Sequence, residues 1–227
     1  MKKTTFVALL LLSSQCFAEN LKDSLQSIES EWAAIYYSTP KQKQGSGYRR
    51  LLDKTNNLSR QHPKNAEPMI LEAMVKATNA DHQDAVSALK SIHEARDLLL
   101  KAIEINPKAM KGSAYVMLGT LYYMVPMWPI GFGDDATAQE MLQTALEINP
   151  DGIDSNYFYG DFLLVNDRLD EAETYFKRAI AAPARAEQLH ADNQLKAEAT
   201  RALKKAQERK ISGSKNLFVF SNSESAK

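Results

Sequence analysis

The sequence has little of what would mark several classes of protein. Its 227 residues include one cysteine, so no internal disulfide framework can form. Basic and acidic residues number 28 each, and this balance gives no electrostatic excess for binding nucleic acid or another polyanion. Nine glycines and eight prolines are too few for a fibrous or low-complexity chain. The remaining composition is that of an average globular protein, which indicates no particular activity.

The first eighteen residues have the pattern of a secretory signal peptide. Lys2 and Lys3 form a positive start, residues 6–12 are an unbroken apolar run, and Cys16 and Ala18 are small residues at positions −3 and −1 of a cleavage site. The run is too short for a permanent membrane span, which needs about 20 residues. No other segment approaches that length. We therefore expect a soluble protein that is exported to a bacterial periplasm and cleaved after Ala18.

Lipidation at Cys16 is the alternative to simple cleavage. Gln15 is too large for the position before a lipidated cysteine, so the sequence favours cleavage after Ala18. Cleavage removes the only cysteine and leaves 209 residues with a net charge of −2. A chain without thiols suits an oxidising compartment.

Three later stretches share one pattern of small and large apolar residues. Each has an alanine, a large apolar residue four positions later, a second alanine seven positions later, and a proline eleven or twelve positions later. These positions share one helical face, alanine lets a neighbouring helix come close, and proline stops the helix from continuing. The three sets are Ala95, Leu99, Ala102 and Pro107; Ala138, Leu142, Ala145 and Pro150; and Ala172, Phe176, Ala179 and Pro183.

The spacing of the last two sets resembles the tetratricopeptide repeat. Ala138 and Ala172 are 34 residues apart, which is the period of that repeat. Gly160 stands twelve residues before Ala172, and Gly119 opens the preceding unit, as in the first helix of the repeat. The resemblance implies a generic helical scaffold, and a scaffold does not by itself imply a function.

We therefore predict an all-α fold, a TPR-like α-solenoid of about four helix pairs with elongated insertions between helices and a C-terminal capping helix. The predicted organisation is a signal peptide over 1–18, a helical-repeat domain over 19–211 and a flexible tail over 212–227. An apolar patch at Leu217–Phe220 in the tail is either a strap on the last helices or a partner-binding tag. Helices are expected at 21–38, 48–61, 66–79, 83–105, 109–124, 135–148, 154–166, 169–182 and 187–210.

An insertion between two predicted helices is the main candidate site. Ala95 and Ala138 are 43 residues apart, nine more than the period, and the excess falls at 122–134. Insertions of this kind lie on one face of a repeat stack, often the binding face. The loop either folds back to fill the groove through Trp128 and Phe132, or lines a pocket or subunit interface, where aromatic residues and methionine are enriched.

Residue types that perform chemistry are sparse. The four histidines form no metal-binding motif, and there is no nucleophile elbow or phosphate-binding loop. We expect a non-enzymatic protein without cofactor or metal. Tyr157 and Asp161 form a neighbouring pair on the expected concave wall. The predicted ligand- or partner-binding residues are Tyr122, Tyr123, Met127, Trp128, Phe132, Tyr157 and Asp161.

A narrower resemblance rests on the Gly133–Asp134 pair that precedes Ala138, Leu142 and Ala145. Over roughly residues 65–182 the chain resembles the T-components of tripartite ATP-independent periplasmic (TRAP) transporters. That resemblance implies a periplasmic accessory protein that holds a small hydrophobic ligand or a protein partner, sometimes as an oligomer. The alternative is a cell-envelope assembly or scaffold factor that acts through self-association. Neither reading involves nucleic acid or a transmembrane segment.

Overall fold

The computed structural model describes residues 21–224, and side chains up to residue 212. The predicted signal peptide lies outside the described residues. All the regular secondary structure of this part of the chain is helical, apart from one isolated bridge between Met127 and Gly133. The helices are a first helix over 21–33 that continues as η1 (Ala34–Ser38), then α2 (Lys41–Gln61), α3 (Ala66–Ala80), α4 (Ala85–Ile105), η2 (Ala109–Gly112), α5 (Ser113–Met124), α6 (Asp135–Ile148), α7 (Ile153–Val165), α8 (Leu169–Ala181), η3 (Ala186–Gln188) and α9 (Leu189–Glu224).

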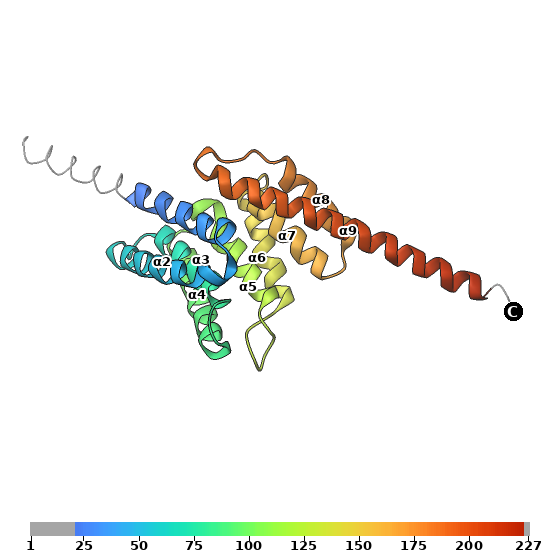
Figure 1. Ribbon diagram of the computed structural model, residues 1–227, viewed down its shortest axis with the longest axis horizontal. Coiled ribbons are helices and arrows are strands. Elements are labelled where there is room, and N and C mark those ends of the chain that lie inside the picture. Colours follow the sequence, from blue (N-terminus) through green and yellow to red (C-terminus); the bar gives the residue numbers. More distant parts are fainter. Residues whose placement is uncertain (1–20, 225–227) are drawn as a thin grey trace, which may run out of the picture.

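Consecutive helices pack as pairs, and the pairs stack side by side into a solenoid (Figure 1). The most extensive contacts are α3 with α4, α5 with α6, and α7 with α8, while α9 covers α8 at the C-terminal end. The all-α, TPR-like solenoid predicted from the sequence is thereby confirmed. Its long C-terminal helix occupies the position of the expected cap.

The repeated alanines and their large apolar partners form the core. All nine of these side chains are fully buried: Ala95, Leu99, Ala102, Ala138, Leu142, Ala145, Ala172, Phe176 and Ala179. The i, i+4, i+7 pattern therefore marks the buried face of each second helix, as the sequence predicts. Burial of one large apolar side chain contributes about 1.5–3 kcal/mol.

The two repeat glycines lie where helices approach most closely. A β-carbon added at Gly119 would lie 2.7 Å from Cγ of Leu142, and one at Gly160 would lie 2.9 Å from the ring of Phe176. Both distances are shorter than van der Waals contact. Because glycine has no side chain, it leaves room on each first helix for the large apolar side chain of the second helix.

Two helix starts differ from the predicted ones by more than two residues. α2 begins at Lys41 rather than 48, because the amide of Gln44 donates to the carbonyl oxygens of Tyr36 and Thr39 and so ties this first turn to the preceding helix. α5 begins at Ser113 rather than 109, because the backbone at 110–112 is left-handed. Tertiary contact thus overrides the glycines near the start of α2, and a local turn shortens α5.

α9 is longer than the predicted last helix. It runs to Glu224, through most of the segment expected to be a flexible tail, and extends beyond the body of the molecule (Figure 1). Its first half packs through the fully buried Ala199 and Ala206. Arg209 fixes it to the α7–α8 turn by donating to the carbonyl oxygen of Leu164 at 2.9 Å. The flexibility of the tail stays a prediction, and the side chains of the Leu217–Phe220 patch lie outside the described part.

Candidate functional site

The loop between α5 and α6 is closed at its base by its own backbone. The amide of Gly133 donates to the carbonyl oxygen of Pro126 (3.0 Å), and the amide of Asp134 donates to that of Tyr122 (2.9 Å). Asp134 also caps α6, because its Oδ1 accepts from the backbone N–H of Thr137 at 2.6 Å. The insertion therefore leaves the body as a closed turn, and it projects beyond α5 and α6 (Figure 1).

Phe132 anchors this loop to the body. Its half-buried ring makes edge contacts with Tyr122 and with His93 of α4, at centroid distances of 5.4 and 5.0 Å. The guanidinium carbon of Arg96 lies over the same ring, 4.7 Å from its centroid. Such a cation–π contact contributes about 0.5–1 kcal/mol at an exposed site. Phe132 and Tyr122 are therefore packed side chains rather than open ones.

The far end of the loop is apolar and solvated. Trp128 exposes 85% of its surface and Met127 exposes 66%, so Trp128 does not fold back into the groove. The peptide bond between Trp128 and Pro129 is cis. Exposed groups of large apolar side chains mark interaction sites more often than ordinary surface. We call the exposed set the apolar tip; it consists of Met124, Met127, Trp128 and Ile130.

The other three predicted site residues lie elsewhere, along the first helices of the last two pairs. The hydroxyl of Tyr123 on α5 donates to Oδ2 of Asp161 on α7 at 2.8 Å. Burial raises the pKa of Tyr123 well above its ordinary value, and the neighbouring Asp161 raises it further. Burial also raises the pKa of Tyr157, with Asp161 again adding to it. Both phenols are therefore protonated and interact with the carboxyl group of Asp161, and Tyr123 donates a hydrogen bond to it.

Sequence reasoning missed three further residues at this place. Tyr36 and Tyr37 of η1 and Glu198 of α9 interact electrostatically with Tyr157. Burial is the main cause of the raised pKa of Glu198. Burial is also the main cause of the raised pKa of Tyr37, and the charge of Glu198 adds to it. We call the combined set the inner wall: Tyr36, Tyr37, Tyr123, Tyr157, Asp161 and Glu198.

One signal in the sequence could have revealed the first-helix part of the inner wall. Trp32, Tyr36 and Tyr37 are spaced so that they share a helical face. In the structure Trp32 stacks on Tyr36 at 5.1 Å and meets the edge of Tyr37 at 6.0 Å. Their proximity to α7 and α9 depends on the curvature of the solenoid, which no local pattern reports.

Residues 130–199 match the family model described as "Tetratricopeptide repeat". This segment, which runs from the α5–α6 loop into α9, is therefore similar to tetratricopeptide repeats. Two crystal structures of MamA are among the solved structures that match this chain. One has 19% identity and a TM-score of 0.42, and the match covers 77% of this chain and 95% of that one. The other has 18% identity and a TM-score of 0.41, with coverage of 85% and 96%. A search of curated proteins gave no match.

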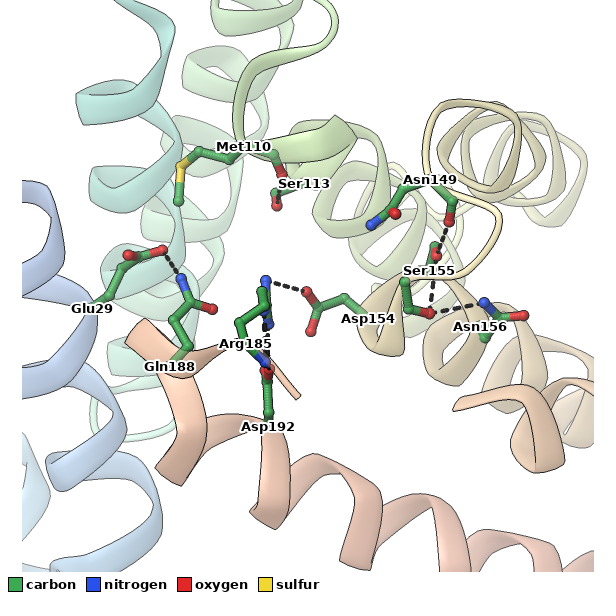
Figure 2. Close-up of polar contacts among 11 residues, drawn as sticks. Glu29, Met110, Ser113, Asn149, Asp154, Ser155, Asn156, Arg185, Gln188 and Asp192 are labelled. Atoms are coloured by element: carbon green, nitrogen blue, oxygen red, sulfur yellow. Dashed lines mark hydrogen bonds and ion pairs between the residues drawn. The ribbon is translucent and has the colours of Figure 1, made fainter. Parts of the chain in front are cut away.

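The two ends of the solenoid meet at a polar junction (Figure 2). Arg185 binds Asp154 of α7 at 3.1 Å and the buried Asp192 of α9 at 2.5 Å. Beside it, Nε2 of Gln188 donates to Oε1 of Glu29 on the first helix at 2.5 Å. Burial raises the pKa of Glu29 from 4.5 to about 7, and the nearby Arg185 only partly offsets this effect.

Among the side chains that the structure describes, no three His, Cys, Asp or Glu residues are grouped so that they could hold a metal ion. In the same part of the chain no helix is long and apolar enough to cross a bilayer. Tetratricopeptide repeats are a scaffold for protein–protein interaction, and the comparisons give no enzyme family.

Proposed function

We propose that this chain is a non-enzymatic tetratricopeptide-repeat adaptor that binds a protein partner through its apolar tip. The observation that carries the proposal is the contrast within one loop. Phe132 and two backbone hydrogen bonds fix its base, yet Trp128 and Met127 remain in water. A fixed base lowers the entropy lost when a partner covers the tip.

The tip can supply a useful binding free energy. Covering one large apolar side chain contributes about 1.5–3 kcal/mol. Three or four such side chains amount to about 5–12 kcal/mol before the cost of association, which supports micromolar binding, about −8 kcal/mol. The groove-filling alternative for Trp128 has no support in this arrangement.

The compartment and the partner class are further parts of the proposal. The signal-peptide pattern of residues 1–18 supports export to the periplasm. The short resemblance to TRAP T-components supports a solute-binding protein of such a transporter as the partner. A small apolar ligand on the inner wall would also be consistent with that resemblance.

Self-association is the second candidate, because two copies could cover each other's tips.

Native mass spectrometry of protein purified from periplasmic extract will identify subunit number and any bound partner. The affinity of the purified partner is then measured for the parent chain, for Trp128→Ala and for the control Val86→Ala, which alters an equally exposed apolar residue of α4.

We expect Trp128→Ala to weaken partner binding at least tenfold and Val86→Ala to leave it unchanged. Equal binding by the parent and Trp128→Ala would refute the role of the tip. A concentration-dependent oligomer that Trp128→Ala dissociates, with no foreign partner, would favour the self-association candidate instead.

A further inference from the structure

The solenoid is closed by contacts between segments very distant in the sequence. Glu29 and Gln188 are hydrogen-bonded although 159 positions apart, and Oγ of Ser38 lies 3.2 Å from Nε2 of His190. The ring of Tyr37 meets the edge of His190 at a centroid distance of 6.1 Å. The first helix and η1 therefore contact η3 and the start of α9.

This closing contact is polar, in contrast to the packing on either side of it. Ile28 and Ile35 anchor the first helix in an apolar cluster with α2 and α3. On the other side, Ala182 and Leu195 pack with Ile153 of α7 in a separate cluster. Among the described residues, no apolar cluster joins the first helix to η3 or α9, and η3 buries none of its residues.

We propose that the first helix is a releasable clasp, which closes the solenoid through the junction of Glu29 with Gln188 and Arg185, and whose release uncovers the inner wall. Tyr36 and Tyr37 are carried by η1, at the end of the clasp, whereas Tyr157 is fixed in α7. Ile28 and Ile35 keep the first helix packed on α2 and α3, so release moves these helices together away from η3 and α9 and separates Tyr36 and Tyr37 from Tyr157 with both apolar clusters intact. That a partner then occupies the wall rests on the proposed function, but the opening itself does not.

The charges around Glu29 make release depend on pH. Arg185 attracts its carboxylate and Gln188 donates to it, while Asp154 of α7 and Glu187 of η3 repel it. Burial outweighs the attraction, so the carboxyl has a pKa of about 7 when the clasp is closed.

The sign of the pH dependence follows from linkage. The closed form holds its proton more tightly than the open form, in which Glu29 returns to the ordinary value of 4.5. The clasp is therefore most stable below pH 4.5, loses stability as the pH rises through 7, and is least stable above 7. Glu29 is partly solvated, which reduces the effect, and we expect the open-to-closed ratio to rise about tenfold between pH 5.5 and 8.5.

Distance measurement by double electron–electron resonance tests the clasp directly. Spin labels are attached at Gln26→Cys on the first helix and Asn193→Cys on α9, two exposed and uncharged positions, in a Cys16→Ser background. Distances are recorded at pH 5.5 and 8.5 for the labelled parent, for Glu29→Gln, which removes the ionisable group, and for Glu31→Gln on the same helix. Far-UV circular dichroism confirms equal helix content.

We expect the parent and Glu31→Gln to gain a longer-distance population at pH 8.5, and Glu29→Gln to keep the short distance at both pH values. A parent distribution that does not change with pH would overturn the proposal. A pH response that persists unchanged in Glu29→Gln would overturn it as well, since His190 or another group would then control the contact. Loss of partner binding in Trp128→Ala with an intact pH response would leave the clasp standing.

Discussion

Gly119→Ala tests the closest helix contact in the solenoid. The added methyl group would lie 2.7 Å from Cγ of Leu142 and 3.1 Å from the carbonyl oxygen of Ala138. Cγ is a branch point of a fully buried side chain, and the carbonyl belongs to the helix backbone, so neither can move aside freely. Overpacking of this kind costs about 1–3 kcal/mol.

Helix propensity acts in the opposite direction. Alanine is about 1 kcal/mol more favourable than glycine within a helix. Because the overlap at Gly119 is severe, we expect an overpacking cost in the upper part of the range of about 1–3 kcal/mol. After the gain in helix propensity is subtracted, the net destabilisation is about 1–2 kcal/mol. For a chain of this size that corresponds to a melting temperature about 2–8 °C lower.

Gly45→Ala in α2 is the matched control. Its methyl group would make only ordinary contact, 3.4 Å from Cβ of His82. The propensity gain then stands alone, and we expect stabilisation by about 0.5–1 kcal/mol. Both variants are compared with the parent by urea and thermal denaturation followed by circular dichroism at 222 nm. If Gly119→Ala is as stable as Gly45→Ala, the close approach of α5 and α6 does not exist, and the packing argument fails.

Three further predictions concern stability. Phe132→Ala should lower the free energy of unfolding by about 1–3 kcal/mol, because the ring of Phe132 is packed. Trp128→Ala should change the same free energy by less than about 0.5 kcal/mol, because Trp128 is exposed. Equal losses of the two variants in urea titrations would contradict this division of the loop. Tyr123→Phe removes the hydrogen-bond donor to Asp161 and should lower the free energy of unfolding by about 1–2 kcal/mol. When the absorbance at 295 nm is followed against pH, the variant should show one fewer tyrosine that ionises at high pH than the parent. An unchanged titration curve would argue against a raised pKa for this hydroxyl. Asp84 caps α4, and hydrogen bonds from the Ser87 side chain and then from backbone amides lower the pKa of its carboxyl. Asp84→Ala should therefore destabilise the fold at pH 7 but much less once the parent's carboxyl is protonated at low pH. A pH-independent effect would exclude the charged cap.

The candidate site was only partly predictable from the sequence. The insertion at 122–134 stood out through its length and its aromatic residues, and the structure confirms that it forms a distinct loop. The sequence treated its aromatic residues as one group. In the structure Phe132 packs inwards, Trp128 points into water and Tyr123 joins Asp161 on another helix. This division depends on which neighbours each side chain finds.

The sequence alone determined the helical repeat. Burial of one helical face requires alanines and large apolar residues at fixed spacing, and that spacing can be read directly from the amino-acid sequence. Tertiary structure alone decided the closing junction and the inner wall. Glu29 and Arg185 are charged residues with no periodic pattern, and the helical spacing of Tyr36 with Trp32 does not indicate its distant neighbours. They meet only because the accumulated rotation between successive helix pairs brings the two ends of the solenoid together, and small rotations of that kind are set by packing over the whole chain.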